Sequence, residues 1–575
     1  MKSQASARVW RAALPGVVVA AGLLGAACSA NTSNQGQTGT SVEGGMQFVD
    51  ADADAGPPVA GGSLAFCIGG ETATGWDPTT SQWVSSSYNV ANSVFDPLVA
   101  VGSDGEYVPY LLESITPNED FTVWTLKIRP GITFHNGTAL DAEAVAKNIK
   151  IRTERGIIAT AFDPIESVEE TGDLEVTVTM ETPWSTFPYA LTAQAGYMQA
   201  PEQIATPGTN DPNPQEATRN PIGTGPFKFV EWVQDKEFTA RKNENYWQKD
   251  ADGNALPYLE EISFPVLVDF QSRNQSLDSG QCDVLETTDA ASIQSYTEKA
   301  EAGTVQMYTD DGLEPGKIFI TLNTSKPPFD DPKAREILAY GIDTQQVSDD
   351  GFLGVFPPAS GPFSKSNDAY ITPEEAGYPS YDLEKARQLH EEYKAEHNGE
   401  PLKFSSIIPP VTEYQQVAEL IRQMGQPFGL EVEIKTEDQP TIVNDLVTGN
   451  YESSGTASQG RILFTSPIPD GDYIFIASEP VIDGVSLNFA RYDNPTLRQC
   501  LDDMRKTDDR AAWKTAGECV QKELAKSLQY IWLVEIRNAV VMQNNVHGFV
   551  DQTAPDGQAL PDSPNPFYAQ VWKKN

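Results

Sequence analysis

The sequence predicts an α/β protein with mixed sheets. Residues 402–408 have the apolar pattern of a strand, residues 412–425 that of an amphipathic helix, and residues 430–434 that of a second strand. A strand, helix, strand unit of this kind makes at least one sheet partly parallel. Hydrophobic residues make up 39% of the 575 residues, which is enough to bury a large core, and the length suggests about four domains.

The first 60 residues predict an exported protein. Three basic residues among the first 11 precede an apolar run of small residues, so residues 1–27 are expected to be a signal peptide. Residues 28–60 are polar and too poor in apolar residues to fold, and we interpret them as a disordered tether. Beyond residue 27, no apolar run approaches the roughly 20 residues that a membrane span needs.

The signal ends at Cys28 in the run LLGAAC, which resembles a bacterial lipobox. The resemblance implies cleavage after Ala27 and a lipid on the Cys28 sulfur. The position three residues before the cysteine usually holds a large aliphatic residue and is Gly25 here. The alternative is an ordinary secretory signal in which Cys28 only lies near the cleavage site.

Further elements follow along the chain. Residues 63–68, 122–128 and 174–180 have strand patterns, and Asp141 is expected to cap a helix. Near the C-terminus, residues 494–505 and 511–525 have helical patterns separated by the polar turn KTDDR. A short turn makes such helices antiparallel neighbours.

The cysteines suggest disulfides, because an exported chain meets an oxidising compartment. Cys67, Cys282, Cys500 and Cys519 allow two bonds in three connectivities, and four buried free thiols are the alternative. Cys500 and Cys519 lie at nearly equal distances from the turn of the predicted helical hairpin. They should therefore face each other at the Cα separation of about 5.5–6 Å that a disulfide prefers.

Composition and motifs exclude several function classes. With 40 Lys and Arg against 81 Asp and Glu, the net charge of −41 would repel nucleic acid, so we expect no nucleic-acid partner. Four His make a His-built metal site improbable, and we predict neither a metal nor a cofactor. The chain has no GxSxG or HExxH motif and no convincing Cys-His arrangement, so we predict no enzyme activity.

Four stretches of the sequence resemble segments of the family 5 extracytoplasmic solute-binding proteins, which include oligopeptide, dipeptide and nickel receptors of ABC importers. The four segments occur in the same order in that family. They are FTVWTLKIRPGITFHNGTALDAEAVAKNI (121–149), NPIGTGPFKFVEW with NENYW (220–232 and 243–247), SGQCDVLE (279–286) and FITLNTSKPPFDDPKAREILAYGID (319–343). Any one of them is weak, and together they are specific.

The resemblance implies a two-lobe periplasmic-binding-protein-like fold with an inserted subdomain in the first lobe. The first lobe would comprise residues 61–95, 222–308 and 545–575, the subdomain residues 96–221, and the second lobe residues 309–544. Hinge closure on the ligand is expected near residues 303–319 and 543–549. The resemblance also makes the strands of Cys67 and Cys282 neighbours, and so pairs these two cysteines.

The implied function is that of the substrate-binding subunit of an ABC importer. Its partners would be a small solute or peptide, the permease and ATPase subunits, and the membrane through a lipid anchor on its outer face. We expect the protein to be a monomer. An oligopeptide is the leading ligand class, a non-peptide solute such as an oligosaccharide or an anionic metabolite is the alternative, and nickel is less favoured. A secreted hydrolase with a carboxylate pair, or an adhesin or scaffold with the same fold, would be a different class.

The predicted ligand contacts lie in two places. Peptide receptors that resemble this chain bind the peptide's amino group with an Asp, and the alignment puts Thr465 at that position. A hydroxyl cannot neutralise an ammonium, so Asp470 or Asp472 could substitute if the loop is shifted, and Arg461 could bind a carboxylate or phosphate. Arg461 could equally be a solvated residue at a strand end.

The other predicted contacts are aromatic. Trp76, Trp83 and Tyr88 could offer ring faces to apolar groups, sugars or cations, with core packing as the alternative.

Two further motif features have expected structural roles. The glycines of GTGPF should permit a tight turn where the chain enters a sheet. His135, beside Asn136 and Gly137, should be hydrogen-bonded rather than catalytic.

Overall fold

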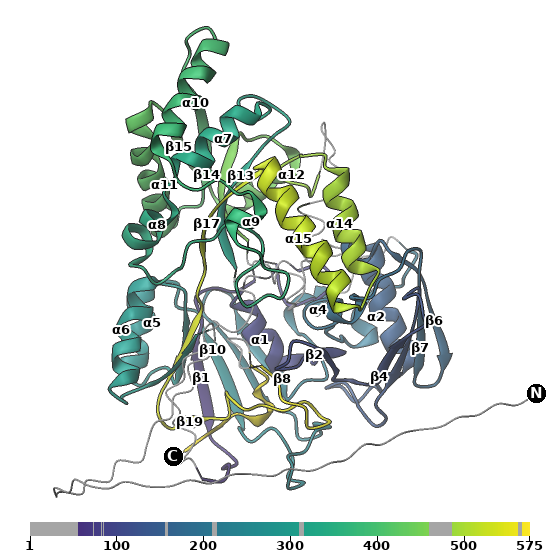
Figure 1. Cartoon of the computed structure of the whole chain (residues 1–575). Coiled ribbons are helices and arrows are strands. Elements are labelled where there is room, and N and C mark those ends of the chain that lie inside the picture. Colours follow the sequence, from purple (N-terminus) through teal and green to yellow (C-terminus); the bar gives the residue numbers. More distant parts are fainter. Residues whose placement is uncertain are drawn as a thin grey trace, which may run out of the picture. The chain divides into compact units, whose positions relative to one another are not determined.

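The computed structural model describes residues 56–574 except 73, 82, 84, 156–158, 210–214, 310–315, 459–475, 477–485 and 562–565 (Figure 1). The predicted lipidation residue Cys28 and the predicted ligand residues Arg461, Thr465 and Asp470 lie outside the described residues. Among the described residues, no helix has both the length and the apolarity that crossing a membrane requires.

A seven-stranded mixed sheet forms the core of the first lobe. Its central strand β1 (Ser63–Cys67) pairs in parallel with β10 (Glu261–Pro265) on one side and with β11 (Val284–Thr287) on the other. The sheet is completed by antiparallel strands β8 (Phe227–Val233), β9 (Glu237–Lys242), β12 (Gln306–Thr309) and β18 (Ala539–Met542), in the order β12-β18-β11-β1-β10-β9-β8. The predicted strand at residues 63–68 is thereby confirmed.

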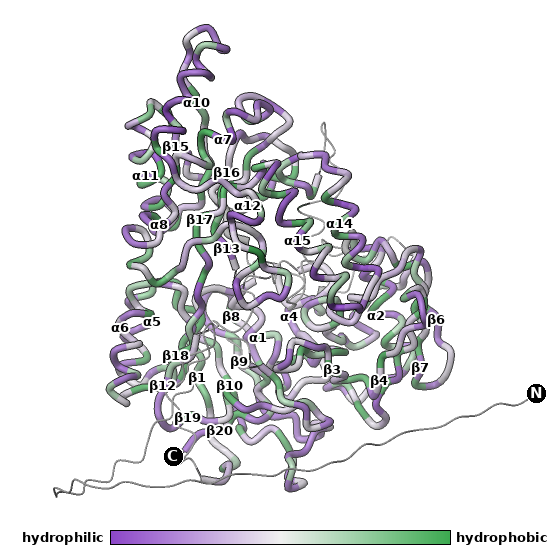
Figure 2. Tube along the Cα trace, in the orientation of Figure 1, coloured by the Kyte–Doolittle hydropathy of each residue, from purple (hydrophilic) through white to green (hydrophobic). Residues whose placement is uncertain are grey.

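A five-stranded sheet forms the core of the second lobe. Its order is β15 (Glu431–Thr436), β14 (Lys403–Ile408), β16 (Ser453–Ser458), β13 (Lys317–Leu322), β17 (Tyr530–Glu535). β14 is parallel to both β15 and β16, which confirms the predicted parallel unit, and β13 is antiparallel to β16 and β17. Figure 2 shows apolar segments along β13 and β17, and every residue of β13 is buried.

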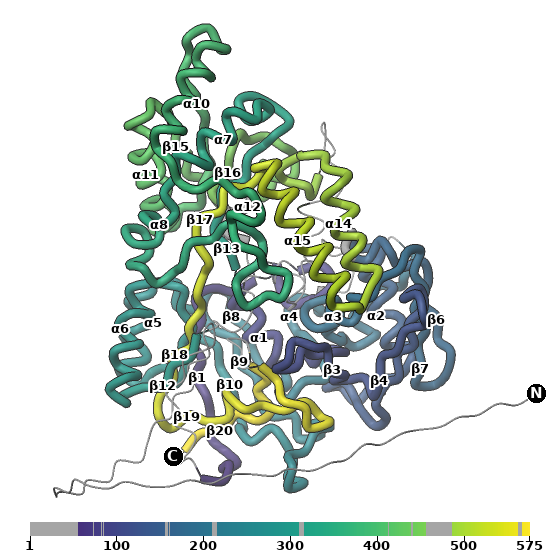
Figure 3. Tube along the Cα trace, in the orientation of Figure 1, coloured from purple at the N-terminus to yellow at the C-terminus, as the bar shows by residue number. Residues whose placement is uncertain are grey.

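The second crossover lies earlier in the chain than predicted. β18 falls inside the range 309–544 that was predicted for the second lobe, yet it pairs with β11 and β12 of the first sheet. Figure 3 shows the yellow C-terminal trace passing from β17 into this sheet. The connection is therefore residues 536–538 and not 543–549, because β18 is a central strand that the first sheet needs between β11 and β12.

The inserted segment builds its own sheet and core. Strands β4 (Leu112–Pro117), β5 (Val123–Ile128), β7 (Glu175–Met180) and β6 (Ile165–Gly172) form an antiparallel sheet in that order. Helix α2 (Ala142–Glu154) packs on it, and the Asp141 side chain accepts from the Ala144 N–H at 3.0 Å, so the predicted cap is confirmed. The short pairs β2 (Val99–Val101) with β3 (Tyr107–Pro109) and β19 (Val546–His547) with β20 (Trp572–Lys573) complete the described strands.

Helices cover the sheets. In and beside the first lobe they are α1 (Ser87–Val94), α3 (Phe187–Ala190), α4 (Gln215–Arg219), α5 (Phe270–Asp278) and α6 (Ala290–Glu301). Those of the second lobe are α7 (Pro332–Gly341), α8 (Thr344–Gln346), α9 (Pro373–Ala376), α10 (Leu383–Glu396), α11 (Thr412–Gly425), α12 (Gln439–Thr448), α14 (Pro495–Arg505) and α15 (Arg510–Ser527). α14 and α15 form the predicted hairpin.

The cysteines come together in the two predicted pairs. Cys67 lies against Cys282 and Cys500 against Cys519, with a Cα–Cα separation of 5.8 Å in each pair. That separation is typical of a disulfide. The first pair connects β1 to the start of the β11 segment, and the second connects α14 to α15.

The glycines of GTGPF have a different role from the one predicted. Neither Gly223 nor Gly225 adopts a left-handed backbone conformation, so a turn that only glycine can make is not their function. A Cβ on Gly225 would lie 2.5 Å from the Val94 carbonyl carbon, and one on Gly223 would lie 2.2 Å from the Val94 oxygen. Both glycines therefore allow two backbones to pack directly against each other.

Candidate functional site

The carboxyl ends of three neighbouring strands form the candidate site in the first lobe. β1 runs parallel to β10 and β11, so all three end at the same edge of the sheet. In open α/β sheets, ligands bind in the crevice outside the carboxyl ends of parallel strands, beside the strand where connections diverge. β1 is that strand, because its parallel partners lie on opposite sides of it.

Glu286, in β11, places a carboxylate at this edge. One carboxylate oxygen accepts from the Asn89 Nδ2 at 2.7 Å, and the other accepts from the Gly69 N–H at 3.1 Å. The Arg273 Nε donates to the Glu286 backbone oxygen at 3.0 Å. Burial raises the pKa of Glu286, and hydrogen bonds from Ser86, Gly69 and Asn89 and the charge of Arg273 counteract it. The result is a positioned acidic group with several polar neighbours.

In the second lobe the corresponding edge is the carboxyl end of β14, β15 and β16. These strands are parallel, so their last residues lie at the same edge of the sheet. These residues are Ile408 of β14, Thr436 of β15 and Ser458 of β16. The segment that follows β16 in the chain carries the three predicted ligand residues of this lobe, which lie outside the described residues. Its starting point is described, because Ser458 pairs with Lys317 at the beginning of β13.

The two crossovers bring these edges together. At the first lobe, Thr287 at the end of β11 pairs with Ala539 at the start of β18. At the second lobe, Lys317 pairs with both Ser458 and Glu535. Four peptide steps separate Glu535 from Ala539, which is at most about 14 Å. The carboxyl edges of the two sheets therefore meet beside the crossovers, where a solute could touch both.

A buried ion pair lies at this junction. The Lys317 Nζ is 3.6 Å from a Glu535 carboxylate oxygen, and the Lys317 side chain is only 5% exposed. The Ile536 N–H also donates to the Gly316 oxygen at 2.7 Å, so the start of the second crossover lies beside the residue that precedes β13. Charged groups of both signs are thus fixed where the lobes join.

The three predicted aromatic residues lie together in the core of the first lobe. The Trp76 ring is 6.2 Å from the Trp83 ring and 5.2 Å from the Phe238 ring, and its side chain is 1% exposed. The Trp83 and Tyr88 rings make an edge-to-face contact with their centroids 5.7 Å apart, and the Trp83 Nε1 donates to the Gly75 oxygen at 3.0 Å. In this structure the rings contact each other, as the core-packing alternative expects, and their contact with a ligand stays a prediction.

His135 has the hydrogen-bonded role that was predicted. Its Nε2 is 3.0 Å from the Gly225 oxygen, and its backbone N–H donates to the Gly223 oxygen at 2.9 Å. Burial lowers the pKa of His135 to about 4, so the ring is neutral at pH 7 and joins the first and second motif stretches. Within the described ranges, no cluster of three or more His, Cys, Asp or Glu residues has the arrangement of a metal site.

Sequence reasoning missed Glu286, Asn89 and Lys317. The family resemblance includes the SGQCDVLE stretch but gives its last residue no role in the site. The usable signal is its position, because a charged residue near the carboxyl end of a buried parallel strand lies at the binding edge of the sheet. Asn89 could not have been found in this way, since only the packing of α1 beside β11 brings it to Glu286.

The comparisons with known proteins agree with this architecture. The family description "Bacterial extracellular solute-binding proteins, family 5 Middle" matches residues 106–470, more than half of the chain. The chain is 27% identical over 517 residues to the glutathione-binding protein GsiB of Pectobacterium atrosepticum, covering 86% of this chain and 92% of the relative.

Two solved structures show the same two-lobe fold. The oligopeptide-binding protein AppA of Bacillus subtilis, in complex with a nonapeptide, aligns with a TM-score of 0.72 at 20% identity over 90% of this chain and 100% of its own. AgaA from A. tumefacien R10, in complex with agropinic acid, aligns with a TM-score of 0.72 at 22% identity over 89% and 99%. With the four motif stretches and the paired crossovers, the matched family description shows that the chain belongs to the family 5 bacterial extracellular solute-binding proteins.

Proposed function

We propose that the chain is the substrate-binding subunit of an ABC importer and captures a short peptide or peptide-like solute between its lobes. The observation that carries the proposal is the meeting of two carboxyl strand edges beside paired crossovers. A solute held there would contact both lobes, so its binding energy could drive closure, and a permease could recognise the closed form. No bond in the solute needs to be broken.

A peptide-like ligand is supported by the relatives. One binds glutathione by its name and one solved structure holds a nonapeptide. The usual amino-group anchor is replaced by Thr465, which favours a ligand recognised through other groups. Arg461 could bind a ligand carboxylate, and the ordered carboxylate of Glu286 could bind an amine. A non-peptide anion is the second candidate, favoured by the structure with agropinic acid.

The test is to identify the bound solute. Protein purified from its native source is denatured, and the released small molecules are identified by mass spectrometry. Reduced glutathione, di- to pentapeptides and the released compound are then titrated calorimetrically. Binding of a peptide in the micromolar range or tighter supports the proposal. A released sugar or other non-peptide anion with no peptide binding would favour the second candidate, and turnover of an ester or glycan would favour the hydrolase.

We also propose that the protein is lipid-anchored to the outer face of the cell membrane through Cys28. One thioether-linked lipid group would carry the apolar area that holds the protein there. The variant C28S should be released into the soluble fraction, while S29A, a change of the neighbouring residue, should stay with the membrane. Retention of C28S after detergent-free fractionation would contradict the lipobox interpretation.

The cysteine pairs are proposed to be disulfides in the exported protein. A bond between Cys67 and Cys282 would close a loop with a sequence separation of 215 residues. In the chain-entropy model this stabilises the fold by about 5 kcal/mol, an upper estimate. Non-reducing peptide mapping should find the 67–282 and 500–519 bonds. Free thiols at all four positions, or a bond between 67 and 500, would overturn the assignment.

A further inference from the structure

The turn between α14 and α15 of the second lobe contacts the inserted subdomain of the first. The Ser185 N–H of the subdomain donates to the Arg505 oxygen at 2.5 Å, and the Ser185 Oγ donates to the Thr507 oxygen at 2.8 Å. Figure 1 shows the hairpin beside the subdomain that carries α2 and β6. These bonds join residues more than 300 positions apart in the chain, and they join different lobes.

Side chains extend this contact. The Arg505 guanidinium carbon lies 5.2 Å from the Trp184 ring centroid, and Trp184 is fully buried in the core of the subdomain. Arg505 also acts electrostatically on Asp163 of the subdomain, whose pKa burial raises and Arg505 lowers. Leu487 of the second lobe packs against the same subdomain core. The interface therefore combines backbone bonds, a cation over an aromatic ring and apolar packing.

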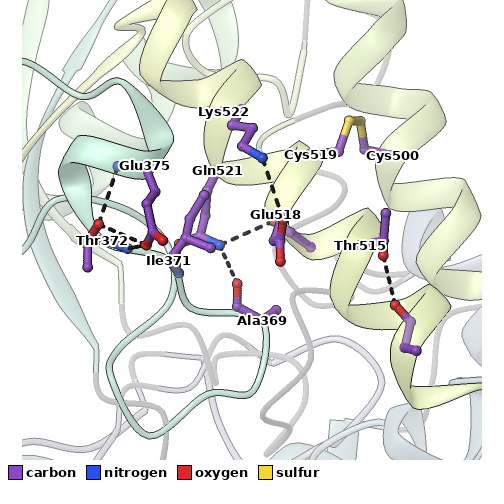
Figure 4. Close-up of polar contacts among 12 residues, drawn as sticks. Ala369, Ile371, Thr372, Glu375, Cys500, Thr515, Glu518, Cys519, Gln521 and Lys522 are labelled. Atoms are coloured by element: carbon purple, nitrogen blue, oxygen red, sulfur yellow. Dashed lines mark hydrogen bonds and ion pairs between the residues drawn. A yellow bond between two sulfur atoms is a disulfide. The ribbon is translucent and has the colours of Figure 1, made fainter.

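The hairpin that carries the turn is held firmly in the second lobe. Cys500 and Cys519 join its two helices (Figure 4). On α15, the Gln521 Nε2 donates to the Ala369 oxygen at 2.5 Å, and the Gln521 Oε1 accepts from the Ile371 N–H at 3.1 Å. The hairpin is thus fixed to the loop before α9 and should move with the second lobe as one body.

We propose that this contact is a latch of the closed form, made by Trp184 and Ser185 of the subdomain and by Arg505 and Thr507 of the hairpin. The inference rests on the hinge motion of the proposed function but not on the identity of the solute. Opening about the crossovers would separate the lobes and break every contact of the latch. The strength of the latch therefore sets the population of the closed form, and with it the apparent affinity for any solute that binds the closed form.

The Ser185 amide provides the test, because its hydrogen-bond acceptor is in the other lobe. We would measure hydrogen exchange of the whole exported protein, without ligand, by mass spectrometry with fragment-level resolution. R505E reverses the charge over Trp184 and beside Asp163, so the Ser185 amide should exchange at least about tenfold faster than in the wild type. S185A, which keeps the backbone bond and loses only the Oγ bonds to the Thr507 and Met504 oxygens, should give a smaller increase at the same amide.

The matched control is K506E, which makes the same charge change one residue later. Lys506 is exposed, and its Nζ lies 3.5 Å from Asp503 of the same helix. K506E should leave the Ser185 amide protected from exchange. In every variant, the amides of β5 and β7 should stay protected if the subdomain stays folded. An unprotected Ser185 in the wild type, or equal exchange in R505E and K506E, would overturn the latch. Because no solute is used, these outcomes are independent of the calorimetric test of solute binding.

Discussion

Asp96 is a buried carboxylate at which two parts of the second motif stretch converge. One oxygen accepts from the Trp247 Nε1 at 3.0 Å and the Thr224 Oγ1 at 3.2 Å, and the other accepts from the Tyr246 hydroxyl at 3.1 Å. Burial raises the pKa of Asp96 to about 6, although all three hydrogen bonds lower it. Desolvation therefore outweighs hydrogen bonding at this residue.

This balance predicts a pH dependence of stability. A raised folded-state pKa means that the folded protein binds the proton more tightly, so Asp96 contributes least stability above pH 6 and most below pH 4. Relative to D96N, the wild type should lose about 2 kcal/mol of unfolding free energy between pH 4 and pH 7. Denaturant unfolding of both proteins at the two pH values measures this. A difference between wild type and D96N that does not change with pH would contradict the pKa.

The proposed ligand residues are testable one at a time. R461A, T465A, D470A and E286Q should each weaken binding of the identified solute by more than about 1 kcal/mol where the side chain contacts it, because a partner group is left unpaired. Isothermal titration calorimetry is the measurement. E260Q is the control, since the Glu260 side chain is 63% exposed and pairs only loosely with Lys242. If all four variants bind like the wild type, these residues are not part of the site.

At the scale of elements, backbone packing explains the GTGPF loop. G225A would place a methyl group 2.5 Å from the backbone of Val94 at the end of α1, and backbone atoms cannot move aside as a side chain can. It should lower the unfolding free energy by more than about 2 kcal/mol. At Gly361, no atom lies within 4 Å of the position that a Cβ would take, and the backbone is not left-handed. G361A is therefore the control and should change stability by less than about 1 kcal/mol. Equal thermal or denaturant stability of the two variants would refute the packing role.

The elements were more predictable from the sequence than their partners. The strands at 122–128 and 402–408 and the helix capped by Asp141 follow from local periodicity and capping, which a short window of sequence contains. β18 was misassigned because its run AVVM is apolar on both faces, and such a run does not show which sheet buries it. The same limit hid Asn89, whose partner Glu286 is 197 residues away.

At the scale of the whole molecule, closure depends on two features that the sequence places far apart. The crossovers, residues 310–316 and 536–538, connect the two sheets, and the latch joins the subdomain to the hairpin. The family resemblance predicted a hinge. Only the strand register shows which residues lie next to the crossovers, namely Thr287 in the first lobe and Lys317 in the second. The latch was not predictable, because its main bonds use backbone groups that carry no sequence pattern.

Solute binding should therefore make the protein more compact. A compact chain of this length has a radius of gyration of about 25 Å, and an open form separated at the latch would have a larger one. Small-angle scattering with size-exclusion chromatography on R505E, in which the weakened latch shifts the solute-free protein toward the open form, should show the decrease at saturation with the solute identified by mass spectrometry. A compound that calorimetry shows not to bind, added at the same concentration, controls for solvent effects. Equal radii with and without the bound solute would contradict closure about the crossovers, since binding across both strand edges is what supplies its free energy.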